Sequence, residues 1–305
     1  MKAPMFSESL FRGITRHVLK PILSDAVPVM RQRRLLGIAA KFRILPRGVL
    51  GRRVEVGGIP ALEVAPSGVS LADGAILFLH GGGYCVGSSE THRTLCERLA
   101  RDAHCTVYGL DYRLAPEHPF PAGLDDAQAA WDALQNRGYE AARIVVAGDS
   151  AGGGLALALA QRLRDARLPL PVALYLISPW TDLTLSGGTA VSMAAVDPLI
   201  DPRWARKFAA FYAAGADLKS PLLSPLFTDP AGLPPIYIDV GSEEVLLDDA
   251  RRFAENAGGA GVDVTLNVHP RMWHDFQLYA GMLPAATRTL RAAAYWVHGQ
   301  LAGAR

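Results

Sequence analysis

A serine between two glycines is the strongest chemical signal in the chain. Ser150 lies in the run Gly148-Asp149-Ser150-Ala151-Gly152, after the β-like residues 143–147 and before a stretch rich in Ala and Leu. Glycines two before and two after a serine at a strand-to-helix turn are typical of a nucleophile elbow, a tight turn that exposes the hydroxyl. An ordinary glycine-rich turn fits the same pattern. A phosphate-binding loop fits less well, because neither GK[ST] nor G-x-G-x-x-G is completed here.

Three consecutive glycines form the second signal. The run His80-Gly81-Gly82-Gly83-Tyr84 directly follows the apolar residues Ala75–Leu79. Such a loop lets backbone N–H groups turn toward the oxyanion that develops during acyl transfer. A flexible glycine loop is the alternative, and the preceding strand together with the later serine motif disfavours it.

A serine nucleophile needs a base and an acid that orients the base. In the chain order serine, acid, histidine, the base belongs in a loop after the last strand. His274 meets that condition, whereas His269 lies at a strand end, so His274 is favoured. The acid should follow the preceding strand. Sequence order alone does not choose among the carboxylates there, which are Glu243, Glu244, Asp248 and Asp249.

Short β-rich runs that alternate with helical stretches must position these residues. Continuous apolar strands separated by helices predict a mostly parallel sheet covered on both faces. The first two strands are close in sequence and can pair as an antiparallel edge. The expected strands are 52–57, 60–65, 75–79, 106–110, 144–147, 172–177, 236–240 and 262–268, and the expected helices are about 91–102, 122–137, 151–166, 246–257 and 285–302.

Two segments do not fit this alternation. Residues 1–45 carry apolar side chains at roughly helical spacing, as surface helices packed on the core or as half of a cap. The connection between the strands near 178 and 235 is too long for a simple loop, and it contains an expected helix from Pro202 to Ala214. We assign the helical cap to two segments and the catalytic core to two others: 1–45 and 185–220 for the cap, and 46–184 and 221–305 for the core.

Composition excludes several classes of protein. The chain has 305 residues, a net charge of +2 and 50% hydrophobic residues, which argues against a disordered or fibrous chain and gives no support for a nucleic-acid partner. We find neither a signal peptide nor a run long enough to span a membrane. Three cysteines without zinc or CxxC spacing predict free thiols in a reducing compartment, and hence a cytoplasmic protein. With no HExxH and no Cys/His cluster, we expect no metal and no organic cofactor.

Taken together, the motifs resemble the hormone-sensitive-lipase-like carboxylesterases (bacterial family IV) of the α/β-hydrolase superfamily. The resemblance runs from about residue 50 to the end of the chain. It implies an α/β-hydrolase fold with a mostly parallel central sheet, helices on both faces and a helical cap. The segments that carry it are His80–Tyr84, Asp111–Ala122, Gly148–Gly153 and His274–Phe276.

The same resemblance assigns roles to individual residues. It implies Ser150 as nucleophile and His274 as base. The family's acid motif is commonly Asp-Pro-Leu-x-Asp, and the aligned stretch here reads Glu244-Val245-Leu246-Leu247-Asp248, so Glu244 takes the acid position. Asp149 is expected to brace the site rather than to join the triad. The implied oxyanion donors are the backbone N–H groups of Gly82, Gly83 and Ala151.

The expected reaction is hydrolysis of short- to medium-chain acyl esters through an acyl-enzyme, with a small-molecule ester as substrate. Related members are assigned to lactone or N-acetyl hydrolysis, which the sequence does not separate from ester hydrolysis. Other members are receptors without catalysis, a role that the presence of Ser150 and His274 argues against. A homodimer through the last strand or the C-terminal helix is a family-level expectation. The side chains expected to line the substrate site are Tyr84, Trp180, Met193, Phe208 and Tyr212.

Overall fold

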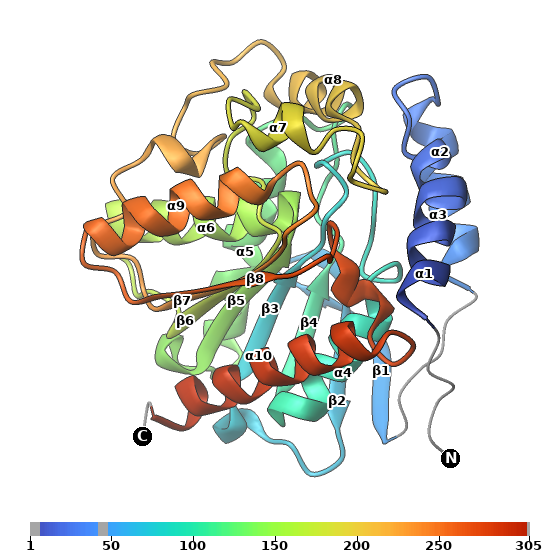
Figure 1. The fold of residues 1–305 in the computed structure, drawn as a ribbon. Coiled ribbons are helices and arrows are strands. Elements are labelled where there is room, and N and C mark those ends of the chain that lie inside the picture. The colour runs from blue at the N-terminus through green and yellow to red at the C-terminus, as the bar shows by residue number, and fades with distance from the viewer. Residues whose placement is uncertain (1–6, 42–47, 304–305) are drawn as a thin grey trace.

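The computed structural model describes residues 7–41 and 48–303, and an eight-stranded sheet forms their centre (Figure 1). The strands are β1 (Val49–Val56), β2 (Ile59–Pro66), β3 (Ala75–Leu79), β4 (Thr106–Leu110), β5 (Ile144–Asp149), β6 (Ala173–Ile177), β7 (Ile236–Gly241) and β8 (Val264–His269). They pair in the order β1-β2-β4-β3-β5-β6-β7-β8. In this order, all neighbouring strands from β4 through β3 to β8 pair in parallel, whereas the pairs β1–β2 and β2–β4 are antiparallel. The predicted parallel sheet with an antiparallel edge is confirmed.

Helices connect the strands and also precede them. Each helix expected from the sequence is present, with ends that differ by a few residues. None of the helices in residues 7–41 and 48–303 combines the length and the apolar character needed to cross a lipid bilayer. The helices are α1 (Glu8–Ile14), a π-helical turn (Thr15–Leu19), α2 (Lys20–Ile22), α3 (Val29–Ala39), α4 (Arg93–Ala103), α5 (Ala122–Asn136), α6 (Ala151–Asp165), α7 (Thr189–Ser192), α8 (Pro202–Ala213), α9 (Leu247–Gly259) and α10 (Pro284–Gly303).

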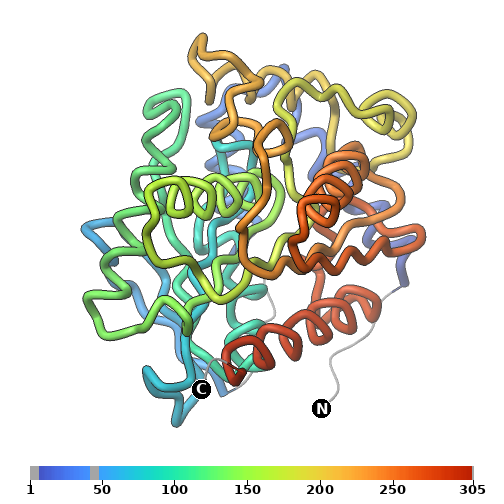
Figure 2. Tube along the Cα trace, turned by 90° about the vertical axis from the view of Figure 1, so that its left-hand side faces the viewer, coloured from blue at the N-terminus to red at the C-terminus, as the bar shows by residue number. Residues whose placement is uncertain are grey.

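Successive side chains of a strand point to opposite faces, and here both faces are buried. Leu77 and Leu79 of β3 pack in one core with α5, α6 and α9. Ile76 and Phe78 of the same strand pack in a second core with α4 and α10. Figure 2 shows α6 (yellow-green) apart from α10 (dark red), which lies in the lower part of the view. Because both faces are covered, the strands read in the sequence as continuous apolar runs rather than as alternating ones.

Capping residues set the start of two helices outside this core. The Ser7 hydroxyl accepts a hydrogen bond from the backbone N–H of Leu10 (3.3 Å) at the start of α1. The Asp201 carboxylate accepts one from the N–H of Arg203 (2.8 Å) at the start of α8, where Pro202 occupies the first turn. Both arrangements satisfy N–H groups that have no partner within the helix.

The N-terminal helices contact the segment between β6 and β7, which includes α8, and Figure 1 shows the upper end of these helices near α8. The indole N–H of Trp204 in α8 donates to Gln32 of α3 (3.0 Å). Arg16 donates to the backbone carbonyl of Val196 (2.7 Å). The predicted boundary between residues 45 and 46 lies outside the described residues. The division into core and cap stays a prediction.

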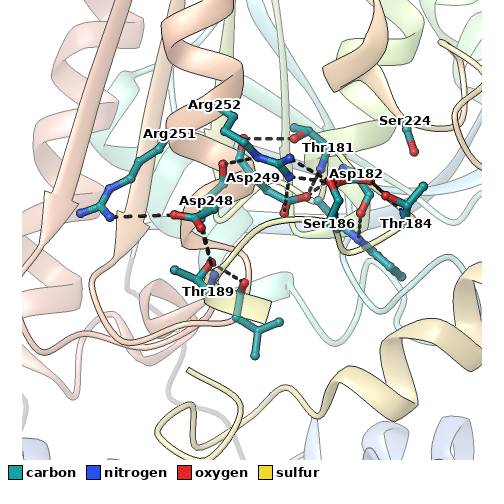
Figure 3. Close-up of polar contacts among 12 residues, drawn as sticks. Thr181, Asp182, Thr184, Ser186, Thr189, Ser224, Asp248, Asp249, Arg251 and Arg252 are labelled. Carbon is teal, nitrogen blue, oxygen red and sulfur yellow. Dashed lines mark hydrogen bonds and ion pairs between the residues drawn. The ribbon is translucent and has the colours of Figure 1, made fainter. Parts of the chain in front are cut away.

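An acidic cluster fixes the segment after β6 to the start of α9 (Figure 3). The Asp249 carboxylate accepts hydrogen bonds from the backbone N–H groups of Thr181 (2.9 Å) and Asp182 (2.8 Å). Arg252 forms an ion pair with Asp182 (2.8 Å). Burial, reinforced by the nearby Asp182 carboxylate, raises the pKa of Asp249 to about 8. The chain leaving β6 is therefore held against α9, just after the loop that carries Glu244.

Candidate active site

Ser150 stands at a tight turn between β5 and α6. Its backbone has a φ of 52°, a conformation that non-glycine residues adopt only where the surrounding structure imposes it. The Ser150 N–H donates to the carbonyl of Ile177 (2.8 Å), and the Ser150 carbonyl accepts from the N–H of Trp180 (2.9 Å). Backbone hydrogen bonds to the end of β6 and the residues after it therefore hold the turn, and the turn does not depend on the Ser150 hydroxyl.

Gly152 gives a test of how tightly this turn is packed. A Cβ at Gly152 would collide with the carbonyl oxygen of Leu79 and lie 2.7 Å from that of His80. Because both atoms belong to the backbone, we expect Gly152→Ala to lower the free energy of unfolding by about 2 kcal/mol or more.

Gly299 in α10 is the matched control, because a Cβ there meets no atom within 4 Å. Gly299→Ala should raise the free energy of unfolding by up to about 1 kcal/mol, the usual gain of alanine over glycine inside a helix. Urea unfolding of both variants measures the difference. Equal stability of the two variants would contradict the close packing of the turn.

The glycine loop after β3 takes a conformation that only glycine adopts easily. Gly82 and Gly83 have φ values of 115° and 60°. Gly81 donates its backbone N–H to Asp149 (2.9 Å). The N–H groups of Gly82, Gly83 and Ala151 have no acceptor among residues 7–41 and 48–303. The loop therefore holds unused donors beside the serine turn.

A buried histidine that the sequence analysis missed completes the support of this loop. His92 donates from Nε2 to the second carboxylate oxygen of Asp149 (3.0 Å). Burial alone would raise the pKa of Asp149, but the charge and hydrogen bond of His92 outweigh it, and the pKa is lowered. Asp149 thus stays ionised and links the serine turn to the glycine loop, as expected of a bracing residue. No local motif marks His92, because its partner lies far away in the sequence.

Among the four carboxylates that the sequence left open, Glu244 contacts His274. Glu244 Oε2 lies 2.7 Å from Nδ1 of His274, and both side chains are buried. Its other oxygen accepts from the Ser178 hydroxyl (3.0 Å). Glu243 forms an ion pair with Arg12 instead (2.7 Å).

The remaining two carboxylates and the competing histidine are engaged elsewhere. Asp248 accepts from the N–H of Thr189 (2.9 Å), and Asp249 belongs to the cluster with Arg252. His269 pairs through Nε2 with Asp239 (2.7 Å). The arrangement at His274 therefore has the form of a histidine oriented by a carboxylate beside a serine.

A second carboxylate lies on the other side of the imidazole. Asp275 Oδ2 is 3.1 Å from Nε2 of His274. Burial alone would lower the pKa of His274, but Asp275 and then Glu244 outweigh it, and the pKa is raised well above its usual value. Among the described residues no hydrogen bond joins Ser150 to His274. Such contacts are often long before substrate binds.

A cavity of about 400 Å³ joins these groups. Gly82, Ser150 and His274 line it, whereas Glu244 lies behind His274, and Gly83 and Ala151 are next to lining residues in the sequence. The rest of the wall is mostly apolar and comes from the N-terminal helices, the chain from residue 86 to the first turn of α4, the segment between β6 and β7, and the chain after His274. Representative side chains are Phe11, Ile14, Leu36, Leu199, Trp204 and Tyr279.

The side chains expected to line the substrate site lie outside the cavity wall: Tyr84, Trp180, Met193, Phe208 and Tyr212. Tyr84 stacks on Tyr212 with ring centroids 3.7 Å apart. A Cβ at Gly83 would come within 2.8 Å of the Phe208 ring. Four of the five are therefore buried aromatic residues packed behind the glycine loop, and Met193 is half-buried at the end of α7. The helical spacing of Phe11 and Ile14 indicated a buried face, but not that a cavity covers it.

A family model described as the alpha/beta hydrolase fold matches residues 76–278, more than half of the chain. The chain belongs to this alpha/beta hydrolase family. This hydrolase is 44% identical to a protein named acetyl-hydrolase from Streptomyces hygroscopicus, over 80% of this chain and 81% of the relative. It is 33% identical to a protein named esterase from Acinetobacter venetianus, over 93% and 92% of the two chains.

Solved structures place the hydrolase within a narrower group. An esterase from the bacterial hormone-sensitive lipase family superposes with a TM-score of 0.91 at 37% identity, covering 97% of this chain and all (100%) of the other. A hormone-sensitive lipase from a metagenome library gives a TM-score of 0.93 at 37% identity, covering 98% and 99%. The resemblance to hormone-sensitive-lipase-like esterases and the expected α/β-hydrolase fold are confirmed.

Proposed function

We propose that this hydrolase cleaves carboxylic esters with Ser150 as nucleophile, His274 as base and Glu244 as the acid that orients the base. The observation that carries the proposal is the 2.7 Å contact between Oε2 of Glu244 and Nδ1 of His274, because His274 lines the same cavity as Ser150. Relatives named esterase and acetyl-hydrolase support the reaction class.

In the proposed cycle, Oγ of Ser150 attacks the ester carbonyl carbon while its proton passes to Nε2 of His274. The bond to the alkoxide then breaks as His274 returns the proton to the leaving oxygen, and Ser150 is left acylated. A water molecule, deprotonated by His274, attacks the acyl carbon and releases the acid. Glu244 holds the imidazole in the tautomer that carries a proton on Nδ1 and stabilises the imidazolium.

The negative charge of each tetrahedral intermediate is assigned to the N–H groups of Gly82, Gly83 and Ala151. Unused backbone donors that are already in place cost no reorganisation when the charge develops. Ala151 opens α6, so its N–H also lies at the positive end of a helix dipole. Asp149 supports the donors through its bond to Gly81.

The N-terminal helices and residues 185–220 are assigned to a cap over this site. Arg33 of α3 ties the cap to the glycine loop by donating to the carbonyls of Cys85 (2.7 Å) and Ala115 (2.8 Å). A cavity of about 400 Å³ has the size of small-molecule sites, and its apolar wall favours short- to medium-chain acyl groups. The homodimer and the cytoplasmic location stay predictions.

A p-nitrophenyl ester series from acetyl to palmitoyl tests the substrate class. We expect kcat/KM to peak at short or medium chains, because an apolar cavity of about 400 Å³ has little room for a long acyl group. Turnover confined to palmitoyl ester would contradict the cavity as the acyl site. A folded protein with no activity on any chain would support a binding role instead.

The 44% identical relative named acetyl-hydrolase favours the removal of acetyl groups. A second candidate function is the N-acetyl hydrolysis that the sequence analysis left open beside ester hydrolysis. Amide cleavage would use the same serine, but its leaving amine needs stronger protonation by His274 than an alkoxide does. Comparing matched acetyl ester and N-acetyl substrates separates the two candidates. A higher kcat/KM for the N-acetyl compound would favour deacetylation.

A further inference from the structure

A buried carboxylate contacts the imidazole nitrogen that should face the serine nucleophile. Nε2 of His274 is the atom that must take the proton of Ser150, yet Oδ2 of Asp275 lies 3.1 Å from it. Asp275 lines the same cavity as Ser150 and is 6% exposed. Its other oxygen, Oδ1, is buried without a hydrogen-bond partner. The ion pair with His274 is therefore the main interaction of this carboxyl group.

The backbone fixes Asp275 in this place. Its φ of 54° lies in the left-handed region, which Asp and Asn tolerate better than other non-glycine residues. Its N–H donates to the Ser178 hydroxyl (3.4 Å), and that hydroxyl donates to Glu244 (3.0 Å). Ser178 thus connects the Glu244 carboxylate to the backbone of Asp275, so both residues keep a defined position relative to His274.

We propose that Asp275 is a positioning residue that retains a proton on Nε2 of His274 in the resting enzyme and thereby sets the lowest pH at which the enzyme works. The proposal rests on the proposed function, because it needs His274 as the base. The retained proton must pass to solvent before Nε2 can accept the proton of Ser150. Once that transfer begins, the same carboxylate stabilises the imidazolium that forms.

Asp275 is distinguished from the other charges near His274 by direct contact with Nε2. Glu244 lies on the Nδ1 side. Asp197, from the segment between β6 and β7, accepts N–H groups of Val245 (2.9 Å) and Leu199 (2.8 Å) rather than a bond from the imidazole. Two further titratable groups face Asp275, Asp149 at the end of β5 and His92 at the start of α4. They are paired with each other.

Two effects of opposite sign follow from removing the Asp275 charge. The pKa of His274 falls, because an opposite charge at this distance favours the imidazolium. The acid limb of kcat/KM should then move to lower pH by about one unit or more. The plateau value of kcat should decrease, because a less basic imidazole is a weaker proton acceptor. The wild-type and variant profiles therefore cross.

The experiment is a pH profile of kcat and kcat/KM on a short p-nitrophenyl ester for wild type and Asp275→Asn. Asn keeps the shape and the left-handed backbone, and Asp275→Gly provides a second variant suited to that backbone. Glu243→Gln is the control, because it removes a carboxylate from a neighbouring loop without touching His274. An NMR titration of the His274 ring reports the same change without substrate.

In both Asp275 variants we expect the acid limb of kcat/KM to lie at lower pH and the pKa of His274 to be lower. Neither quantity should shift in Glu243→Gln. A rate loss that is uniform across pH would overturn the proposal and leave Asp275 a structural role. If His274→Ala loses activity but the pH profiles of the Asp275 variants do not shift, this inference is refuted and the proposed function stands. Retained activity in His274→Ala refutes the proposed function itself.

Discussion

Replacing Ser150 with alanine is expected to lower kcat by at least about 10³-fold. The substitution removes the hydroxyl that attacks the ester but keeps a Cβ at the strained position, where φ is 52°. The bonds that hold the turn, to Ile177 and Trp180, come from the backbone and persist. The loss should therefore be chemical rather than structural, and it is measured with the short p-nitrophenyl ester under saturating conditions.

Ser224→Ala is the control for this experiment. Ser224 is also buried, and its hydroxyl accepts a hydrogen bond from the N–H of Leu183 (2.8 Å) away from the cavity wall. Its kcat should stay close to that of the wild type. Retained turnover in Ser150→Ala, in a protein with wild-type unfolding behaviour, would remove Ser150 from the nucleophile role.

Glu244→Gln is expected to lower kcat by about 10²- to 10⁴-fold, because a neutral amide neither fixes the Nδ1 proton nor stabilises the imidazolium. The Glu244 carboxylate accepts hydrogen bonds from Nδ1 of His274 (2.7 Å), the Ser178 hydroxyl (3.0 Å) and the Gly241 N–H (2.5 Å). Gln keeps the volume of the side chain, so the packing of this loop is preserved.

Glu243→Gln is the matched comparison one residue earlier. Its carboxylate pairs with Arg12 at the surface, with 30% of the side chain exposed, so its loss should change kcat little. The reverse ranking of the two variants would move the acid to Glu243. Both variants are measured at one pH on the plateau, so that a shifted acid limb does not mimic a loss of rate.

Local motifs made part of this site predictable. The runs around Ser150 and Gly82 are short, and the chemistry of a strained turn or a glycine loop restricts which residues can occupy them. The strands were predictable for a related reason, because a sheet buried on both faces requires continuous apolar runs. These features depend on near neighbours in the chain, which is why the sequence carries them.

Contacts between distant residues were not predictable in the same way. Four carboxylates lie within residues 243–249, just after β7, and only the path of the loop brings Glu244 to His274. His92 supports Asp149 from a separate segment and belongs to no motif.

The aromatic candidates for the substrate site do not line the cavity. Phe208 and Tyr212 of α8 pack behind the glycine loop instead. The apolar wall instead includes Phe11 and Leu36 from the N-terminal helices. Hydrophobic spacing indicates which face of a helix is buried, but not whether a core or a cavity covers it.

The most direct test of the account is covalent labelling by an aryl organophosphate, followed by intact mass and peptide mapping. The account predicts one label per chain, located on Ser150, with activity lost in proportion to labelling and no label in Ser150→Ala. Asp275→Asn and Gly299→Ala should still be labelled, because both keep the serine and its base. A label on another residue, or a folded and active enzyme that takes no label, would contradict Ser150 as the nucleophile.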